Sequence, residues 1–435
     1  MGKVFKFALI LALVFSLTLS IACNKRFEDV EGTTDTTDNV GQEAQIEATK
    51  QDVEIEMWGW FSFGGSISTF EEKTGIKVKE KIIPFHECKN EYMKALANGT
   101  GPDLLVFDSS FFGQYTVNNI LENLLDEPYK AEKYKGDIIG WESGFSLDNK
   151  QLLSLSYSTA PYITMYREDI MRENGFPSEP EEFGKFIEHP DNILKVSKKL
   201  KEQGKFIFQY PTDITDIVGA TMGYFDEEFN YIREGEMYAK AIDMAQEMYD
   251  NDLISNKNFW NDTGKKAVNE DKLVMFFLAS YAMDELEKMA PDQKGKWRVT
   301  TSPLGIAAWG SDTRLSINAH SEHKEETWKL IEHLVTSVNW TVNVVPSYIP
   351  ATTYNEYLSQ QKDFFGGQNV YPMLVDLAIN MNQYKLTPLD EEVRELYLKG
   401  IWQSLLDTKN SHDKIEQMRK EIEKELEEEK NVLLE

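Results

Sequence analysis

Hydrophobic and polar positions alternate near the start of the folded region and then give way to helical patterns. Residues 53–57 and 76–83 show the two-residue period of a strand, and 104–107 is a short unbroken apolar run. Helical patterns at 66–74 and 87–97 lie between these strands. Short connections between alternating strands and helices are typical of parallel sheets, so the pattern predicts an α/β fold.

The same two patterns continue along the chain, without an internal repeat. Asp108 and Ser109 follow the strand at 104–107, at the carboxyl end where ligands bind in open α/β sheets. A glycine-rich loop is expected between the strands ending at 302 and beginning at 314. Further strands are predicted at 152–157, 163–166, 206–210, 273–277, 297–302 and 314–317, and helices at 111–125, 167–174, 181–188, 191–203, 238–251, 281–289, 325–336, 371–380, 391–406 and 412–429.

The first residues have the pattern of a secretion signal. Lys3 and Lys6 precede an apolar run over 7–19, and small residues then lead to Cys23. A cysteine at this place indicates a lipoprotein signal peptide over 1–22, with the lipid on Cys23. An ordinary secretory signal or a membrane anchor is the alternative. Residues 23–51 are polar and poor in apolar side chains, so they are expected to form a flexible tether.

Composition restricts the partners and the chemistry. The formal net charge is −27, which repels nucleic acid and anionic lipid surfaces. Cys88 is the single cysteine after Cys23, so no internal disulfide and no zinc site built on several cysteines is expected. Serine-hydrolase, zinc-protease and P-loop motifs are absent from the sequence. We therefore expect no enzymatic activity, no cofactor, no metal and no nucleic-acid partner.

Several motifs, taken in order, resemble the substrate-binding lipoproteins of ABC importers, in the extracellular solute-binding family 1 typified by maltose- and oligosaccharide-binding proteins. The resemblance covers about residues 53–406. One position departs from the family pattern, because Arg167 stands where the family usually has Asn. The motifs are WGW at 58–60, GTGPD at 99–103, YREDIMRENGFP at 166–177, DKLVM at 271–275 followed by Tyr281, SPLG at 302–305, TWKLI at 327–331 and YIP at 348–350.

The resemblance implies a periplasmic-binding-protein-like fold, in which two α/β lobes are joined by crossing strands with a ligand cleft between them. Lobe one is expected at 52–160 plus 300–345, and lobe two at 161–299 plus 346–435. The resemblance further implies that the protein captures a carbohydrate, foremost an oligosaccharide, by lobe closure. The partners would be the membrane subunits of an ABC importer, and the protein would be anchored in the cell membrane through Cys23, facing outside the cytoplasm.

The residue types that suit a sugar are aromatic rings for its C–H faces and acids, amides or hydroxyls for its hydroxyl groups. Asp108 has an alternative role as the N-cap of the following helix, and the segment of Trp260 and Asp262 has an alternative role as a structural turn. The side chains expected to contact ligand are Trp58, Trp60, Phe61, Asp108, Ser109, Tyr157, Trp260, Asp262, Tyr281, Trp309, Asp312 and Tyr348.

A non-sugar solute and a sensor role remain open as alternatives, whereas a glycosidase and a metal site are disfavoured. A non-sugar solute, or a sensor that feeds a receptor, would use the same fold and cleft. A surface glycosidase would need two paired carboxylates, and acids are too frequent in this chain to identify such a pair. His320 and His323 have a spacing that a metal site could use, but a solvated loop and helix start is the favoured interpretation.

Overall fold

A sheet of eight strands runs through the part of the chain that the structure describes. The structure is a computed structural model, and it describes residues 53–117, 119–337 and 343–434. The predicted signal peptide, the tether and Cys23 lie outside the described residues. The order β2-β1-β3-β7-β4-β5 runs across the sheet, and β6 and β8 both pair with β4.

The first three strands confirm the predicted parallel arrangement. Strand β1 (Glu54–Gly59) pairs in parallel with β2 (Lys77–Ile82) and with β3 (Leu104–Asp108). Helices α2 (Gly65–Thr74) and α3 (Phe85–Ala97) make the two crossovers. All five residues of β3 are buried, as the unbroken apolar run predicted for a strand covered on both faces.

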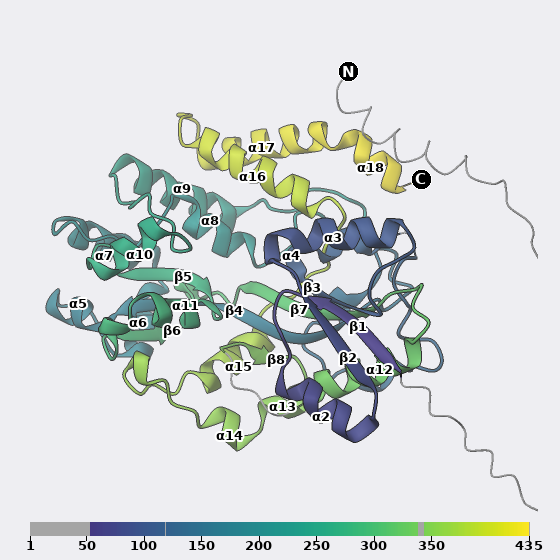
Figure 1. The fold of residues 1–435 in the computed structure, drawn as a ribbon. Helices are drawn as coiled ribbons and strands as arrows, with labels where there is room; N and C mark the ends of the chain where they lie inside the picture. The colour runs from purple at the N-terminus through teal and green to yellow at the C-terminus, as the bar shows by residue number, and fades with distance from the viewer. Residues whose placement is uncertain (1–52, 118, 338–342, 435) are drawn as a thin grey trace, which may run out of the picture. The chain divides into compact units, whose positions relative to one another are not determined.

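Strand β4 changes its partners along its length. Its range is Leu155–Arg167, and its first half pairs antiparallel with β7 (Trp309–Ile317) and β8 (Val345–Pro346). Its second half pairs with β5 (Met275–Ala279) and β6 (Trp297–Thr300). In Figure 1, β4 and β7 lie between a group of elements around β1 and a second group around β5 and β6.

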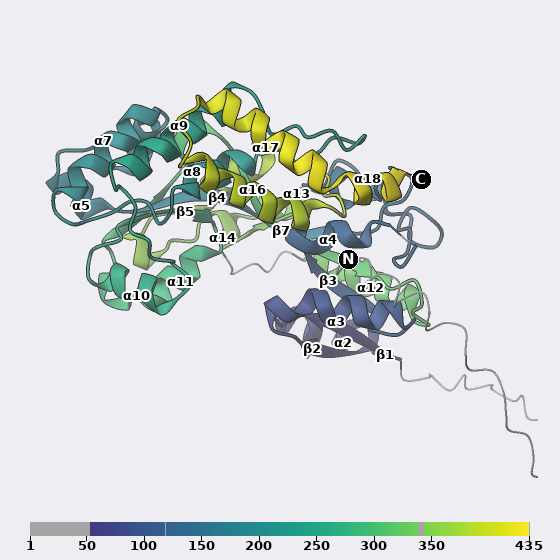
Figure 2. The ribbon, with the colours of Figure 1, turned by 90° about the horizontal axis from the view of Figure 1, so that it is seen from above.

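Helices surround the sheet, and the last ones return to the group around β5 (Figures 1 and 2). Figure 2 shows the yellow C-terminal helices α16 and α17 beside α8 and α9. The remaining helices are α4 (Ser109–Phe112), α5 (Glu168–Glu173), α6 (Pro180–Ile187), α7 (Pro190–Lys201), α8 (Thr212–Gly219), α9 (Glu236–Asp250), α10 (Asp262–Asn269), α11 (Ala282–Met289), α12 (Lys324–Val335), α13 (Ile349–Thr352), α14 (Asn355–Leu358), α15 (Tyr371–Asn380), α16 (Asp390–Ser404), α17 (Ser411–Glu425) and α18 (Glu427–Leu434).

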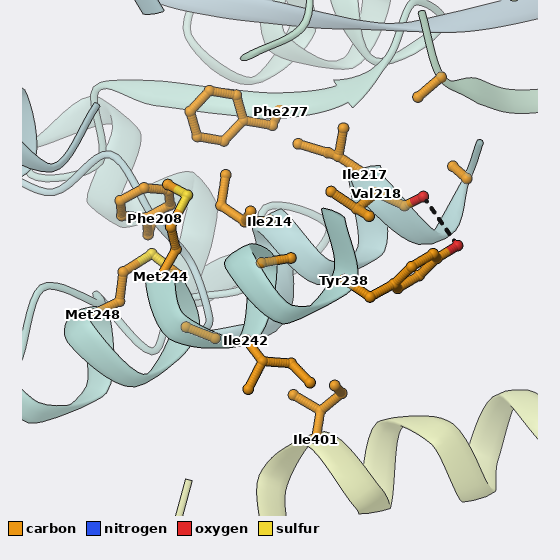
Figure 3. Close-up of a cluster of buried hydrophobic side chains, with 14 of the residues drawn as sticks. Phe208, Ile214, Ile217, Val218, Tyr238, Ile242, Met244, Met248, Phe277 and Ile401 are labelled. Atoms are coloured by element: carbon orange, nitrogen blue, oxygen red, sulfur yellow. Dashed lines mark hydrogen bonds between the residues drawn. The ribbon is translucent and has the colours of Figure 1, made fainter. Parts of the chain in front are cut away.

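A hydrophobic core explains why the C-terminal helices pack against α8 and α9. Figure 3 shows Ile217 of α8 and Ile242 of α9 in one cluster with Ile401 of α16. The Tyr238 hydroxyl donates a hydrogen bond of 3.4 Å to the Val218 carbonyl, which satisfies a polar atom inside this cluster. Burying each aliphatic side chain contributes about 1.5–3 kcal/mol, so segments distant in sequence are held together here.

The helix predicted at 111–125 is wrong beyond its first residues. Helix α4 ends at Phe112, and a single 3-10 turn, Gly113–Tyr115, follows. Asn119 has a φ of 51°, which ends helical geometry, and Leu121 forms an antiparallel bridge with Asn318. Around Leu121 the segment therefore runs as an extended chain beside the end of β7, where the Glu122 N–H donates to the Ile317 carbonyl at 3.0 Å.

The strand predicted at 206–210 is also wrong. Phe206 and Phe208 make isolated bridges to Leu273 and Ile254 rather than a ladder. The backbone N–H groups of Gln209 and Tyr210 donate to the Asp213 carboxylate at 2.6 and 3.3 Å. A side chain thus takes the bonds that a neighbouring strand would have supplied, and the chain turns into α8.

The prediction of a glycine-rich loop up to residue 314 is wrong in its second half, because strand β7 already begins at Trp309. Between Ala160 and Pro161 of β4 the register with β7 shifts at Gly310. A Cβ on Gly310 would lie 2.5 Å from the Ala279 Cβ and 2.6 Å from the Ala160 carbonyl oxygen. Glycine is needed here for the close approach of three strands, not for a loop.

Candidate functional site

A cleft of about 1410 Å³ opens beside the strands at the centre of the sheet. One part of its lining comes from the loop after β1, helix α2, the end of β3, and strands β4 and β7. The other part comes from Trp260, before α10, and from Tyr281 and Asp284 at the start of α11. The cleft thus has walls from both of the element groups that β4 connects.

Asp108 lies at the base of the cleft, where β3 ends and α4 begins. Its Oδ1 accepts a hydrogen bond of 2.9 Å from the Ser110 N–H, which caps α4, and its Oδ2 accepts one of 2.7 Å from the Ser311 hydroxyl. Burial raises the pKa of the Asp108 carboxyl, while the bonds from Ser110 and Ser311 oppose this rise. The carboxyl therefore caps the helix and lines the cleft at the same time.

Asp312 lines the cleft next to Asp108 and forms an ion pair with Arg314. Its Oδ2 lies 2.7 Å from a terminal guanidinium nitrogen of Arg314. Burial raises the pKa of the Asp312 carboxyl, and the Arg314 charge opposes that rise. The guanidinium also donates to the Ser154 hydroxyl at 3.1 Å and the Gly140 carbonyl at 3.0 Å. These bonds fix the Asp312 side chain in the sheet.

Aromatic rings form the wall contributed by the loop after β1. Trp60 lies edge-on to Phe61, with ring centroids 5.4 Å apart, and edge-on to Phe85 at 5.5 Å. The Phe63 ring packs on Tyr157 at 4.9 Å. Tyr157 occupies a shift in the register between β4 and β7, and such bulges reorient a side chain. The rings in this wall are held by one another.

Two exposed aromatic rings form the opposite wall. Trp260 is 50% exposed and Tyr281 is 42% exposed, and their ring centroids lie 5.9 Å apart at 34°. Burial raises the pKa of the Tyr281 hydroxyl to about 12, and the nearby charge of Asp108 contributes to this rise. The Tyr281 hydroxyl therefore remains a hydrogen-bond donor at neutral pH.

The structure brings seven of the predicted site residues together. They come from six separate places in the sequence and share only their position in the cleft lining. These residues are Trp60, Phe61, Asp108, Tyr157, Trp260, Tyr281 and Asp312.

The other five lie outside the cleft lining. The Trp58 indole N–H donates a hydrogen bond of 2.9 Å to the Glu56 carboxylate, and Lys81 lies over the Trp58 ring. Ser109 is buried, and its hydroxyl accepts from the Asp312 N–H at 3.2 Å. Asp262 is exposed in the first turn of α10, Trp309 is buried against Tyr384, and Tyr348 packs on Tyr134.

Many lining residues escaped the sequence prediction, and three of them carry an aromatic ring or a carboxyl group, namely Phe63, Phe85 and Asp284. Phe63 belongs to the same aromatic loop as Trp60, so the local sequence contained a signal for it. Asp284 follows Tyr281 by three residues, a spacing that places both side chains on one helix face. Phe85 opens α3 after Pro84, and nothing in the local sequence distinguishes it from a core residue.

Within 53–117, 119–337 and 343–434, no three His, Cys, Asp or Glu side chains are grouped in a way that would hold a metal ion. None of the helices in the described ranges is both long and apolar enough to cross a bilayer.

Comparison with known families identifies the group. A family model described as "Bacterial extracellular solute-binding protein" matches residues 66–354. The chain belongs to this family. The match confirms the resemblance inferred from the motifs of this solute-binding protein. No curated protein matches its sequence.

Solved structures establish the fold class of the solute-binding protein. A family 1 extracellular solute-binding protein has a TM-score of 0.74 and 19% identity, covering 86% of this chain and 99% of that one. The galacto-N-biose/lacto-N-biose I-binding protein of the ABC transporter from Bifidobacterium longum has a TM-score of 0.70 and 17% identity. That match covers 87% of this chain and 98% of that one. The sugar-binding protein MalE from Xanthomonas citri has a TM-score of 0.67 and 15% identity, and the match covers 88% of this chain and 100% of that one. The fold is the predicted two-lobe, periplasmic-binding-protein-like α/β fold.

Proposed function

We propose that this solute-binding protein captures a carbohydrate, foremost an oligosaccharide, and delivers it to the membrane subunits of an ABC importer. The observation that supports this most strongly is the cleft with aromatic rings on both walls and carboxyl and hydroxyl groups at its base. Its volume of about 1410 Å³ exceeds the roughly 300–1,000 Å³ of pockets for drug-sized ligands. An extended chain of sugar rings, flat on one face and rich in hydroxyls, suits such a lining.

The proposal includes closure of two lobes about the crossing strands. Lobe one comprises 52–160 plus 300–345, and lobe two 161–299 plus 346–435. The exchange of β4 partners near Ala160 supports this division, as does the packing of α16 on α8 and α9. A ligand that contacts Trp60 and Tyr281 together would favour the closed state by its differential affinity. Small-angle scattering with and without saturating ligand tests this, because an unchanged radius of gyration would contradict closure.

The proposal also places the protein outside the cytoplasm, anchored in the cell membrane through a lipid on Cys23. The sequence pattern around Cys23 supports it. Two acyl chains give stable anchoring at about 0.8 kcal/mol for each buried methylene. Detergent-phase partitioning of the expressed protein, compared with a Cys23→Ala variant, tests the anchor. Equal partitioning of both proteins into the aqueous phase would refute it.

Alternatives remain within the same cleft. A sensor that feeds a receptor would bind the same ligand, and a non-sugar solute would replace it. The family match is to solute-binding proteins, which favours binding over a glycosidase activity.

The deciding experiment is a thermal-shift screen of the purified protein against mono- and oligosaccharides, amino acids, polyamines and metal ions. We expect a rise in melting temperature with at least one saccharide. A rise with an amino acid, polyamine or metal and with no saccharide would overturn the carbohydrate proposal. Product analysis after incubation with the saccharide that binds distinguishes binding from hydrolysis.

A further inference from the structure

The charged groups of the cleft are unevenly distributed. Three carboxyl groups line it, those of Asp108, Asp284 and Asp312. The cationic candidates in the lining are Lys73, which is exposed in the last turn of α2, and His333. The Nε2 atom of His333 lies 2.9 Å from the Ser66 carbonyl oxygen, so the protein already engages this ring nitrogen. The base of the cleft is therefore acidic, and its lysine stands at the edge.

Only one of the three carboxyl groups has a cationic partner. Asp312 pairs with the buried Arg314. Among the described residues, no Lys, Arg or His lies within ion-pair distance of Asp108 or Asp284. Asp108 accepts hydrogen bonds from the Ser110 N–H and the Ser311 hydroxyl, and Asp284 accepts one from the Asn343 amide. All these donors are neutral. The charges of Lys362 and Lys288 also act on Asp284, so Asp108 is the carboxyl group that a cation entering the cleft would meet without a competing partner.

Asp312 is the most enclosed of the three carboxyl groups. It is 2% exposed, and Arg314 and the Ser156 hydroxyl hold its side chain. The carboxyl groups of Asp108 and Asp284 are therefore the ones that remain for a ligand in the cleft.

Two rings in the cleft suit the same ligand chemistry. Trp260 and Tyr281 line the same cleft as Asp108, and Trp260 stands beside Tyr281 with half of its surface exposed. The faces of Trp and Tyr rings attract cations that approach within about 6 Å. The Asp108 carboxyl and these two rings therefore line the same space.

We infer that the saccharide this cleft prefers carries a protonated amine, bound between Asp108 and the rings of Trp260 and Tyr281. This inference rests on the proposed carbohydrate function and specifies the substrate class. An amino sugar supplies hydroxyl donors, an apolar ring face and one ammonium with three donors. The N-acetylated sugar lacks the charge, and a uronic acid places a carboxylate against three others.

Burial of the base agrees with this assignment. Burial raises the pKa of the Asp108 carboxyl, which means that the empty cleft disfavours its negative charge. An ammonium group would stabilise the ionised carboxyl and form a charge-assisted hydrogen bond with it. A neutral hydroxyl would form a weaker bond with either protonation state.

Titration calorimetry with matched ligands tests the inference on the full chain. The ligands are a β-1,4 trimer of glucosamine, the trimer of N-acetylglucosamine and the trimer of glucose, which differ only at C2. The galactosamine, N-acetylgalactosamine and galactose monosaccharides extend the series to the other C4 configuration. We expect the amine to bind roughly tenfold more tightly than its neutral counterparts, as one charge-assisted contact provides.

Asp108→Asn should remove most of this preference while a neutral saccharide still binds. Asp250→Asn removes a charge from an exposed position at the end of α9, and this variant should retain the preference for the amine. If neutral saccharides bind as tightly as the amines, or more tightly, the inference fails and the carbohydrate function stands. If no saccharide binds at all, the proposed function itself fails. The comparison of ligands on the unmodified protein decides the question even if Asp108→Asn does not fold.

Discussion

Asp312 and Arg314, two residues apart on β7, form an ion pair of 2.7 Å with both side chains almost fully buried. Successive alternate residues of a strand point to the same face, so the pair follows from the strand geometry. It lies where β7 pairs with β3 and β4 at once. One end of the pair lines the cleft, and the other is held by Ser154 and Gly140.

Arg314→Met should strongly destabilise the protein, because it leaves the Asp312 carboxylate buried without its partner. Removing one member of a buried pair costs about 3–5 kcal/mol. The double variant Asp312→Leu with Arg314→Met should cost less than the sum of the two single variants. Urea unfolding gives these free energies of unfolding. Lys185→Met, which breaks an exposed pair with Glu181, is the control and should cost under about 1 kcal/mol.

Gly310→Ala should also destabilise the fold, because its Cβ would meet the Ala279 Cβ at 2.5 Å and the Ala160 carbonyl oxygen at 2.6 Å. Displacing packed backbone costs roughly 1–3 kcal/mol. Gly65→Ala is the matched control, since its Cβ would enter open space near the start of α2. Thermal unfolding compares the two variants. Equal melting temperatures would show that β7 can shift at Gly310 without cost.

Trp60→Ala and Tyr281→Ala should each weaken saccharide binding, because each removes a ring from one wall of the cleft. An aromatic contact contributes about 0.5–1.5 kcal/mol beyond its buried area, so we expect a loss of several-fold to tenfold or more. Trp402→Ala on α16 removes a ring that is 40% exposed and outside the lining, and it should leave the affinity unchanged. Calorimetry gives the dissociation constants. Unchanged affinity in both cleft variants would exclude this site.

Stability should fall as the pH rises from about 4 to about 8, in part because of Asp213. Burial raises the pKa of this carboxyl from 3.8 to about 8. Between these values the native state holds more protons than the unfolded state, so the free energy of unfolding decreases with pH. Asp213→Asn should make this dependence shallower, and Asp216, whose pKa burial raises to about 6, should maintain part of it.

Urea unfolding at pH 5 and pH 8 measures that dependence for the unmodified protein and the variant. Asp243→Asn on the exposed face of α9 is the control and should keep the original slope. The same slope in Asp213→Asn as in the unmodified protein would contradict the assignment.

Local sequence predicted the parallel strands and most helices because their hydrophobic periods were long and clear. It failed at 111–125 and 206–210, where apolar residues had the right period but a different partner. Leu121 pairs with Asn318, and Asp213 takes the N–H groups of Gln209 and Tyr210. Leu121 and Asn318 are far apart in the chain, so no short window of sequence contains both. The Asp213 contact is local, and there a side chain competes with the strand for the backbone N–H groups.

The sequence by itself determined the family, the order of the elements and the strand end at Asp108. The tertiary structure decided which aromatic and acidic side chains lie in one cleft. Trp58 and Trp60 are two residues apart, yet Trp60 lines the cleft and Trp58 lies under Lys81 outside the lining. Trp260 and Asp108 are far apart in the chain and line the same space. The physical reason is that side-chain direction depends on register shifts, such as those at Tyr157 and Gly310, which are set by the packing of distant strands.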